Sequence, residues 1–299
     1  MIDTSKKQLY GLLGKNISYS LSPGMHNAAF KHFDINAEYK LFDTDNINVF
    51  FQKEVSSGKI SGFNVTVPYK IDIYDKLKAY SGWEVPEPDS FLGAINTVNI
   101  EKGKLTGYNT DSRGFYYSLI SVVNGDPETF AKDKNIFIFG SGGAGRAIAL
   151  FFAILTFKEK GFRKVNIYDA DKTRLTEVVD SCKNILDQEI CTAVDVDDIQ
   201  EVMKTCDIVV NATPLGTKEG DDRSAVPLNC LKEGMVVCDL IYARETALIK
   251  AAKEKGLVAV NGLGMLVNQA ALAFQIWTGK PFAEVRDIMW KATSEETEK

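Results

Sequence analysis

A glycine-rich segment near the middle of the chain constrains the fold more than any other feature. The segment 140–145 fits G-x-G-x-x-G, and it lies directly between the apolar run 135–139 and the apolar run 146–155. In a strand–turn–helix unit, glycines at this spacing permit a tight turn and let a pyrophosphate approach the helix N-terminus. The segment therefore predicts a Rossmann-type dinucleotide-binding unit, with a plain strand-to-helix turn as the alternative.

An acidic residue follows the next predicted strand at the distance expected for ribose recognition. The run 163–169 ends at Asp169, 24 residues after the last glycine of the motif. A carboxylate here accepts hydrogen bonds from ribose hydroxyls and repels a 2′-phosphate, which favours NAD over NADP. In the alternative interpretation, Asp169 or Asp171 caps a helix, and Lys172 and Arg174 neutralise a phosphate.

Alternating strand and helix patterns predict an α/β fold with parallel strands in two successive parts of the chain. The first part has strand-like runs and helical patterns, and two further runs form a predicted hairpin: strands at 9–14, 37–43 and 60–65, helices at 22–33, 46–57 and from Pro68, and the hairpin AINTVNI–KLTGY. The second part has continuous apolar strands at 134–140, 163–169, 205–211, 234–241 and 257–261. Residues after 264 show only helical patterns, so they add no strand.

The composition favours a cytoplasmic enzyme that acts on small molecules. The 299 residues include 35 Lys and Arg against 40 Asp and Glu, and the net charge of −5 argues against nucleic acid or an anionic membrane as a partner. The five cysteines include no C-x-x-C pair, so neither a disulfide framework nor a metal site is indicated. The N-terminus lacks the pattern of a signal peptide, and the longest apolar run, 147–157, is too short to span a bilayer.

A lysine and an aspartate are the candidate acid–base residues. The two histidines, His26 and His32, lie six residues apart in one predicted helix and are interpreted as core or surface residues. Lys70 falls in the first turn of a predicted helix, where the helix dipole disfavours the ammonium and so favours proton release. Asp111 begins a later helix and would orient the ammonium if it lay beside it. The alternatives are a surface lysine and a helix N-cap.

Two serines precede the first predicted helix. Ser22 has the position of an N-cap, because Pro23 after it suits the first helical residue. Alternatively, the hydroxyls of Ser20 and Ser22 bind a substrate carboxylate together with the helix dipole.

Eight segments, taken together, resemble the shikimate dehydrogenase family over residues 10–279. They are YSLSP (19–23), NVTVPYK (64–70), GAINT (93–97), GYNTD (107–111), GSGGAG (140–145), NATPLG (211–216), DLIY (239–242) and NGLGMLVNQAALAFQIWTG (261–279). Each segment is short, but their order and spacing match those of the family.

The resemblance implies a substrate-binding domain of residues 1–112 completed by 262–299, and an NAD(P)-binding Rossmann domain of residues 113–261. It implies reversible reduction of 3-dehydroshikimate to shikimate in aromatic amino acid biosynthesis, or the related quinate reaction. Lys70 resembles the catalytic lysine that protonates the developing alkoxide, and Asp111 its partner. The substrate-binding residues implied are Ser20, Ser22, Asn64, Thr66, Lys70, Asn96, Asp111, Tyr242 and Gln269. The coenzyme-binding residues implied are Gly140, Ser141, Gly142, Gly143, Ala144, Gly145, Asp169, Thr213 and Gly262.

The chain departs from the family pattern at one informative place. NADP-dependent members carry Asn-Arg-Thr after the second Rossmann strand, whereas this chain has Asp169, Ala170 and Asp171. It thus resembles the NAD-preferring quinate/shikimate branch, with NADP as the alternative coenzyme. Ser22 stands where some quinate-active members have threonine, which favours shikimate. The rival interpretations are a non-catalytic NAD-binding regulatory protein of the same fold and another lysine-dependent Rossmann dehydrogenase. A monomer or homodimer is expected.

Overall fold

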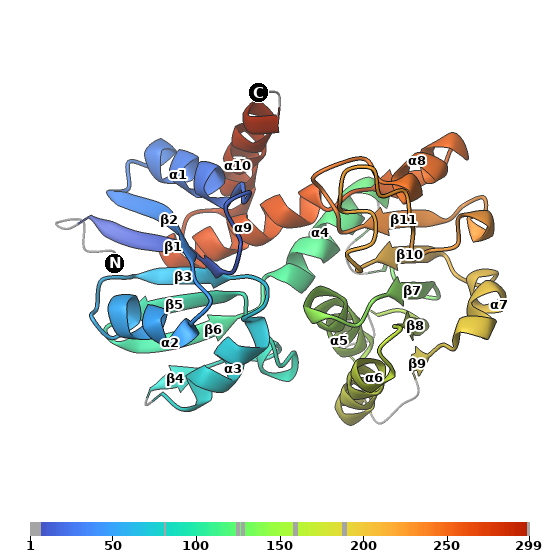
Figure 1. The fold of residues 1–299 in the computed structure, drawn as a ribbon, viewed down its shortest axis with the longest axis horizontal. Coiled ribbons are helices and arrows are strands. Elements are labelled where there is room, and N and C mark those ends of the chain that lie inside the picture. The colour runs from blue at the N-terminus through green and yellow to red at the C-terminus, as the bar shows by residue number, and fades with distance from the viewer. Residues whose placement is uncertain are drawn as a thin grey trace. The chain divides into compact units, whose positions relative to one another are not determined.

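The chain divides into two compact units, which the computed structural model describes over residues 7–80, 82–123, 126, 129–157, 161–186 and 190–297. The first unit comprises residues 1–110 and 267–299, and the second comprises residues 111–266. Each unit contains a six-stranded sheet with helices around it (Figure 1). The α/β class predicted from the sequence is confirmed.

The sheet of the first unit is mixed, with the strand order β2-β1-β3-β5-β6-β4. Its strands are β1 (Gln8–Gly14), β2 (Ala37–Asp43), β3 (Gly62–Val65), β4 (Trp83–Glu84), β5 (Thr97–Glu101) and β6 (Lys104–Tyr108). β1 pairs in parallel with β2 and β3, while β3 and β6 run antiparallel to β5. The predicted hairpin is therefore present, and its two strands extend the sheet away from the parallel part.

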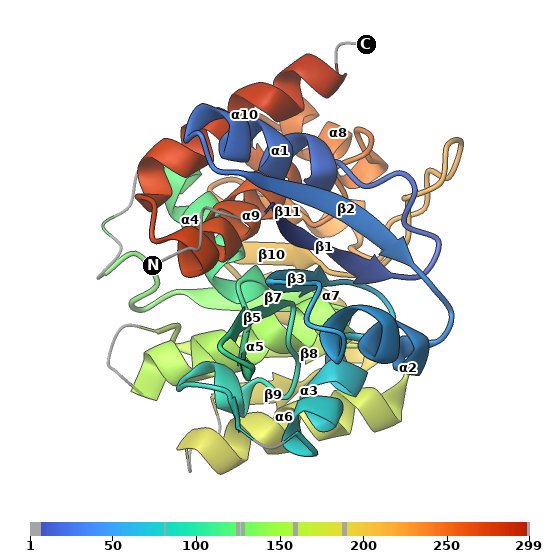
Figure 2. The same ribbon diagram turned by 90° about the vertical axis from the view of Figure 1, so that its left-hand side faces the viewer.

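Helices from both ends of the chain cover the first sheet. They are α1 (Ser22–His32), α2 (Ile47–Phe50) with a π-helical turn (Phe51–Val55), α3 (Lys70–Lys78), a 3-10 turn (Asp89–Phe91), α9 (Leu263–Thr278) and α10 (Phe282–Thr297). α1 and α10 lie side by side (Figures 1 and 2). The rings of Tyr10 and Trp277 lie 4.8 Å apart, so α9 packs on the sheet. A Cβ at Gly62 would lie 2.6 Å from Trp277 Nε1, and this glycine is what allows that contact. The last two helices thus belong largely to the first unit.

Two helices of the first unit differ from the sequence prediction. The helix expected at 46–57 is a short α-helix followed by the π-helical turn. The helix expected from Pro68 begins at Lys70 instead. The Tyr69 N–H donates to the carbonyl of Thr66, so residues 66–69 form a turn that precedes the helix.

The sheet of the second unit is parallel throughout, with the strand order β12-β11-β10-β7-β8-β9. Its strands are β7 (Asn135–Phe139), β8 (Lys164–Tyr168), β9 (Cys191–Ala193), β10 (Ile208–Asn211), β11 (Val236–Asp239) and β12 (Val258–Val260). The chain leaves β7 toward β8 on one side and later returns to β10 on the other. In such a sheet, ligands bind at the carboxyl ends of the strands where the strand order reverses.

The helices of the second unit lie along its sheet (Figure 1). They are α4 (Asp111–Val123), α5 (Gly143–Phe157), α6 (Lys172–Leu186), α7 (Ile199–Met203) and α8 (Ala247–Glu254), with 3-10 turns at Val196–Asp198 and Leu228–Cys230. Residues 147–154 of α5 are buried, as expected for the longest apolar run. Within the described ranges, no helix has the length and hydropathy needed to cross a bilayer. Cys182, Cys191, Cys206 and Cys238 are buried free thiols, and Cys230 is half-buried.

Candidate active site

The glycine-rich segment forms the predicted turn between β7 and α5. Gly140 has a φ of 101°, a conformation that favours glycine. A Cβ at Gly145 would lie 1.9 Å from the carbonyl oxygen of Gly140, so only glycine lets the helix start this close to the strand. A Cβ at Gly142 would meet open space, so the backbone there is accessible to a ligand. The turn therefore fits a bound pyrophosphate at the start of α5.

Asp169 follows β8 and holds the glycine-rich turn in place. Its Oδ2 accepts hydrogen bonds from the backbone N–H of Ser141 at 2.7 Å and from the Ser141 hydroxyl at 2.8 Å. Its Oδ1 accepts from the N–H of Asp171 at 2.8 Å. Burial opposes ionisation, but these bonds and the nearby Arg174 outweigh it and hold the pKa of the Asp169 carboxyl below its ordinary value. Sequence reasoning missed the bond to Ser141, because the two residues are 28 positions apart.

The cations near Asp169 are already paired with carboxylates. Asp171 caps α6 by accepting from the N–H groups of Thr173 and Arg174, so the capping part of the alternative interpretation holds for Asp171. The Arg174 guanidinium lies 2.9 Å from Asp171 and 3.7 Å from Asp169. Lys172 donates to Asp195 at 2.6 Å. Both cations that could neutralise a 2′-phosphate thus have acidic partners.

We expect Asp169→Asn to lower the free energy of unfolding by about 1–2 kcal/mol near neutral pH, because an amide cannot replace the carboxylate toward all three donors. A folded-state pKa below the unfolded value means that this stability is present above about pH 4 and is lost as the pH falls through the lower, folded-state value. Urea unfolding at about pH 7 and about pH 3 measures it. The difference in free energy of unfolding between the wild type and the variant should be smaller at the acidic pH.

Asp287→Asn is the matched control for that measurement. The Asp287 side chain is 69% exposed, and its ion pair with Arg286 lies on the surface. It should change stability little at either pH. If Asp169→Asn lowered the free energy of unfolding equally at both pH values, the role assigned to the ionised carboxylate would be contradicted.

A second polar network lies at the carboxyl ends of β10 and β11. Asn211 Nδ2 donates to Asp239 at 3.0 Å, and Asn211 Oδ1 accepts from the N–H and the hydroxyl of Thr213 at 3.0 and 2.7 Å. The hydroxyl of Thr246, the N-cap of α8, donates to Asp239 at 2.6 Å. Burial raises the pKa of the Asp239 carboxyl, against the effect of these donors. The network fixes the predicted coenzyme residue Thr213, and its other members lie in or near the segments NATPLG and DLIY.

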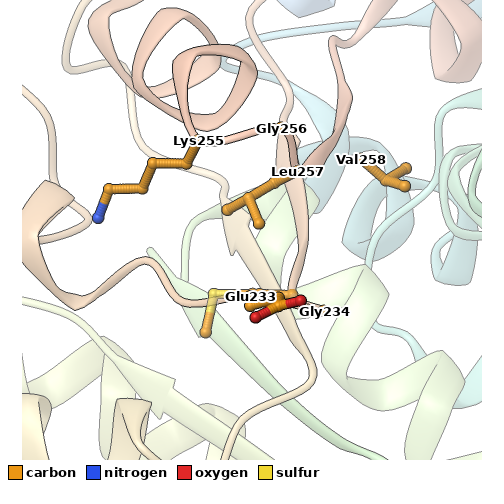
Figure 3. A pocket seen from close by; sticks show the side chains of 7 residues that line it. Glu233, Gly234, Lys255, Gly256, Leu257 and Val258 are labelled. Carbon is orange, nitrogen blue, oxygen red and sulfur yellow. The ribbon is translucent and has the colours of Figure 1, made fainter.

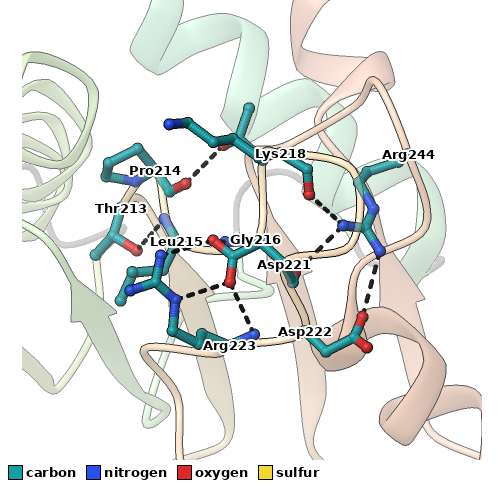
Figure 4. Close-up of polar contacts among 10 residues, drawn as sticks. Thr213, Pro214, Leu215, Gly216, Lys218, Asp221, Asp222, Arg223 and Arg244 are labelled. Carbon is teal, nitrogen blue, oxygen red and sulfur yellow. Dashed lines mark hydrogen bonds and ion pairs between the residues drawn. The ribbon is translucent and has the colours of Figure 1, made fainter.

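The loop after β10 is tied to the loop after β11 by Arg244 (Figure 4). The guanidinium donates to the backbone carbonyls of Lys218 and Asp221 and lies 3.4 Å from the Asp222 carboxylate. Asp221 in turn pairs with Arg223 at 2.8 Å. Two loops at the ligand-binding edge of the sheet are therefore held by one arginine that sequence reasoning did not single out.

A pocket of the second unit lies at the amino ends of β11 and β12, opposite the strand ends that carry the glycine-rich turn (Figure 3). Glu233, Gly234, Lys255 and Leu257 line it, just before β11 and β12 begin. The Lys255 ammonium donates to two backbone carbonyls and is thus engaged in the fold. Because the strands are parallel, this pocket is at their amino ends and away from the glycine-rich turn.

The two serines of the first unit lie where the sequence placed them, but the capping interpretation of Ser22 is wrong. α1 begins at Ser22, its N-cap position is Leu21, and the Leu21 side chain makes no capping hydrogen bond. The hydroxyl of Ser20 instead donates to the hydroxyl of Ser22 at 3.1 Å. The Ser20 hydroxyl also accepts from the Ser22 N–H at 3.3 Å, so Ser20, and not Ser22, is the serine whose hydroxyl contacts the helix terminus.

Three predicted substrate residues meet through hydrogen bonds in the first unit. Asn64 Nδ2 donates to the backbone carbonyl of Asn96 at 3.2 Å. Asn96 Nδ2 donates to Gln269 Oε1 at 3.4 Å, and Asn96 Oδ1 accepts from the N–H of Thr110 at 2.7 Å. Thr66 follows β3 directly, and its N–H donates to the carbonyl of Leu13. The buried amides of Asn64 and Asn96 and the half-buried amide of Gln269 thus lie near the end of β3.

The remaining predicted residues lie at the ends of elements. Lys70 is the first residue of α3 and is half-buried, and Asp111 is the buried first residue of α4. Tyr242 follows β11. A Cβ at Gly262 would lie 2.0 Å from the carbonyl of Leu240, so this glycine permits close backbone approach. The pairing of Lys70 with Asp111 stays a prediction.

The histidines take the core and surface positions expected of them. His26 is fully buried, and His32 is exposed and lies 3.4 Å from Glu284. Among the described residues, no cluster of three or more His, Cys, Asp or Glu side chains is placed to hold a metal ion.

Comparisons with known proteins identify two family matches along the chain. Residues 12–98 match the family description "Shikimate dehydrogenase substrate binding domain", and residues 262–292 match "Shikimate 5'-dehydrogenase C-terminal domain". The chain is 39% identical over 289 residues to "Shikimate dehydrogenase (NADP(+))" of Methanococcus maripaludis, covering 94% of each chain.

Solved structures are similar over almost the whole length. The quinate dehydrogenase of Corynebacterium glutamicum in complex with NAD is 30% identical, with a TM-score of 0.82 and coverage of 95% of this chain and 99% of that one. The shikimate 5-dehydrogenase of Listeria monocytogenes in complex with shikimate and NAD is 29% identical, with a TM-score of 0.80 and coverage of 96% and 97%.

Proposed function

The chain belongs to the shikimate dehydrogenase family, and from this premise we propose that it catalyses the reversible NAD(P)-dependent reduction of 3-dehydroshikimate to shikimate. The observation that carries the proposal is the hydrogen-bonded group of amides formed by the buried Asn64 and Asn96 and the half-buried Gln269 in the first unit. A ring with several hydroxyls needs many directional partners, and an unmatched buried polar group is costly. The first unit, with the C-terminal helices, is the substrate-binding domain, and the second is the coenzyme-binding domain.

Lys70 is the proposed general acid in the direction of carbonyl reduction. The coenzyme supplies or accepts the hydride at the C3 position of the substrate. Lys70 donates a proton to the oxygen that becomes the C3 hydroxyl, and takes it back in the oxidation direction. Asp111 accepts a hydrogen bond from the ammonium and orients it. Both residues begin helices, so their backbones are fixed by regular structure.

The other proposed substrate contacts follow the chemistry of the ring. The hydroxyls of Ser20 and Ser22, which lie 3.1 Å apart at the start of α1, bind the carboxylate, with Tyr242 nearby. Asn64, Thr66, Asn96 and Gln269 bind ring hydroxyls. Ser22 has no methyl group to fill space beside the substrate, and shikimate is proposed to be a better substrate than quinate.

NAD is proposed as the preferred coenzyme, held by the glycine-rich turn, Thr213 and Gly262. Asp169, Asp171 and Arg174 together carry a net charge of −1, because a single guanidinium faces two carboxylates. A 2′-phosphate would meet this acidic group, and position 170 offers an alanine rather than a cation. The hydroxyls of an unmodified ribose can instead donate to these carboxylates.

A steady-state assay with shikimate and quinate, each with NAD and with NADP, tests the proposal. We expect the highest kcat/KM for shikimate with NAD. Turnover of neither acid would reject the function and favour the non-catalytic, regulatory interpretation. A strong preference for NADP would reject the role of Asp169 but leave the reaction standing.

A further inference from the structure

Tyr39, on β2, has a buried hydroxyl that none of the proposed roles uses. The residue is 2% exposed, and its hydroxyl donates to Asn64 Oδ1 at 2.7 Å. Its backbone is held on both sides by Asn27 of α1, which accepts from the Tyr39 N–H at 2.9 Å and donates to the Tyr39 carbonyl at 3.0 Å. The ring lies flat against that of His26, with centroids 4.2 Å apart and planes 3° apart. The hydroxyl is therefore fixed in space by contacts along the whole residue.

The direction of each hydrogen bond around Tyr39 follows from its partners. Asn64 Nδ2 faces the backbone carbonyl of Asn96, which can only accept. The Asn64 carbonyl oxygen must then face Tyr39, so the Tyr39 hydroxyl is the donor in that bond. Burial raises the pKa of the Tyr39 hydroxyl well above its usual value, and a hydrogen bond with Ser22 opposes this rise. Since the single Tyr39 proton goes to Asn64, a hydrogen bond between Ser22 and Tyr39 requires the Ser22 hydroxyl as its donor.

Tyr39 thus joins two groups of proposed substrate residues. On one side, Ser20 donates to Ser22 at 3.1 Å, and Ser22 begins α1, whose Asn27 bonds to the Tyr39 backbone and whose His26 stacks on the Tyr39 ring. On the other, Asn64 continues through Nδ2 to Thr97 Oγ1 at 3.0 Å. The serines would face the carboxylate of the substrate, and Asn64 would face its ring hydroxyls.

We propose that Tyr39 is a positioning residue that couples the Ser20–Ser22 hydroxyl pair to Asn64, so that the carboxylate and hydroxyl subsites keep a fixed geometry. The inference rests on the proposed function of this site. Tyr39 acts through Ser22 and Asn64, and its own contact with substrate is not required. A phenylalanine would fill the same apolar space, so the hydroxyl is the group that this role needs.

His26 supports the ring of Tyr39 without taking part in proton transfer. It is fully buried, and neither ring nitrogen has a hydrogen-bond partner among the described residues. Burial lowers the pKa of His26 to about 3, so the imidazole is neutral at physiological pH. The ring also lies 5.4 Å from that of Trp277, within the aromatic layer under α9. It serves as a flat uncharged surface that holds the phenol ring.

Tyr39→Phe tests the inference, with Tyr10→Phe as the matched control. Tyr10 lies on the neighbouring strand β1 and is 3% exposed. Its hydroxyl donates to the Gln8 side chain at 2.7 Å and not to a proposed substrate residue. We expect Tyr39→Phe to raise the KM for shikimate about tenfold, because Asn64 loses its donor and Ser22 its acceptor. The KM for NAD should stay within about twofold for both variants, and Tyr10→Phe should keep the wild-type KM for shikimate.

A double-mutant cycle with Ser22→Ala separates coupling from a general loss of stability. If Tyr39 acts through Ser22, the loss of kcat/KM in the double variant should be smaller than the product of the two single losses. Strictly additive effects would overturn the coupling. A lower melting temperature of Tyr39→Phe with an unchanged KM for shikimate would overturn the positioning role.

An assay of the wild type in the same series distinguishes failure of the proposed function from failure of the role of Tyr39. If the wild type does not turn over shikimate, the proposed function fails and the inference fails with it. If it does so and Tyr39→Phe shows the same KM, only the inference on Tyr39 is rejected.

Discussion

Replacing Lys70 with alanine is expected to lower kcat for shikimate oxidation by about 10²-fold or more, the usual range for loss of a general acid or base. The alkoxide that forms at C3 during carbonyl reduction would have no positioned proton donor, and the C3 hydroxyl no base during oxidation. The affinity for NAD should persist, because the glycine-rich turn and Asp169 lie in the other unit. Steady-state kinetics with shikimate, and NAD titration followed by fluorescence, measure the two effects.

Lys78→Ala is the matched control for this experiment. Lys78 lies at the other end of α3, where its exposed ammonium pairs with Asp75 at 3.4 Å. Its removal should leave kcat within about twofold of the wild type, as for most surface substitutions. Turnover by Lys70→Ala at the wild-type rate would discard the catalytic assignment, whatever the substrate.

The double substitution Ala170→Arg with Asp171→Ser is expected to shift the ratio of kcat/KM for NADP over NAD by about 10²-fold or more. The new arginine adds a cation at the position where NADP-dependent relatives are expected to have one. Serine at 171 can still cap α6, but it no longer pairs with Arg174. Arg174 then keeps the longer contact of 3.7 Å with Asp169 and can turn toward a 2′-phosphate. Hydrogen bonds to charged groups contribute about 1.5–3 kcal/mol each, and two of them account for the shift.

Asp169 is left unchanged in that design because it holds the glycine-rich turn through Ser141. Ala170→Leu, which adds bulk without charge, is the control for position 170. The KM for shikimate should be the same in all of these variants. An unaltered coenzyme ratio in the double variant would show that charge at 169–174 does not set the preference.

The fold could be predicted well wherever hydrophobic periodicity was strong. The run at 37–43 coincides with β2, and the strands at 134–140 and 163–169 contain β7 and β8. The runs of β7 and β8 are continuous because both faces of each of these strands are covered. β9 was not predicted, because its residues Cys-Thr-Ala do not form a continuous apolar run.

The errors in the first unit have physical causes that a sequence pattern does not contain. Phe50, Phe51 and Val55 are buried whether the backbone is α-helical or π-helical, so the same pattern fits both. The sequence predicts Ser22 as the N-cap and Pro23 as the first helical residue. The helix instead begins at Ser22, one residue earlier, and this leaves the Ser22 hydroxyl for other partners.

The candidate site was predictable as a set of residues but not as a network. Short motifs identified Ser22, Asn64 and Asp169, because their residue types suit the chemistry. Asn64 is connected to Tyr39, which lies 25 positions away in a strand of ordinary composition. Asp169 is connected to Ser141, which lies 28 positions away. Long-range hydrogen bonds of this kind depend on the packing of whole elements, and no local spacing reveals them.

The central claim is that this chain moves a hydride between C3 of shikimate and a nicotinamide coenzyme. The direct measurement is oxidation of shikimate carrying deuterium at C3, with NAD, followed by analysis of the recovered coenzyme and product. The account predicts one deuterium in the nicotinamide ring for each molecule of 3-dehydroshikimate formed. Coenzyme reduced without deuterium, or no 3-dehydroshikimate at all, would contradict it.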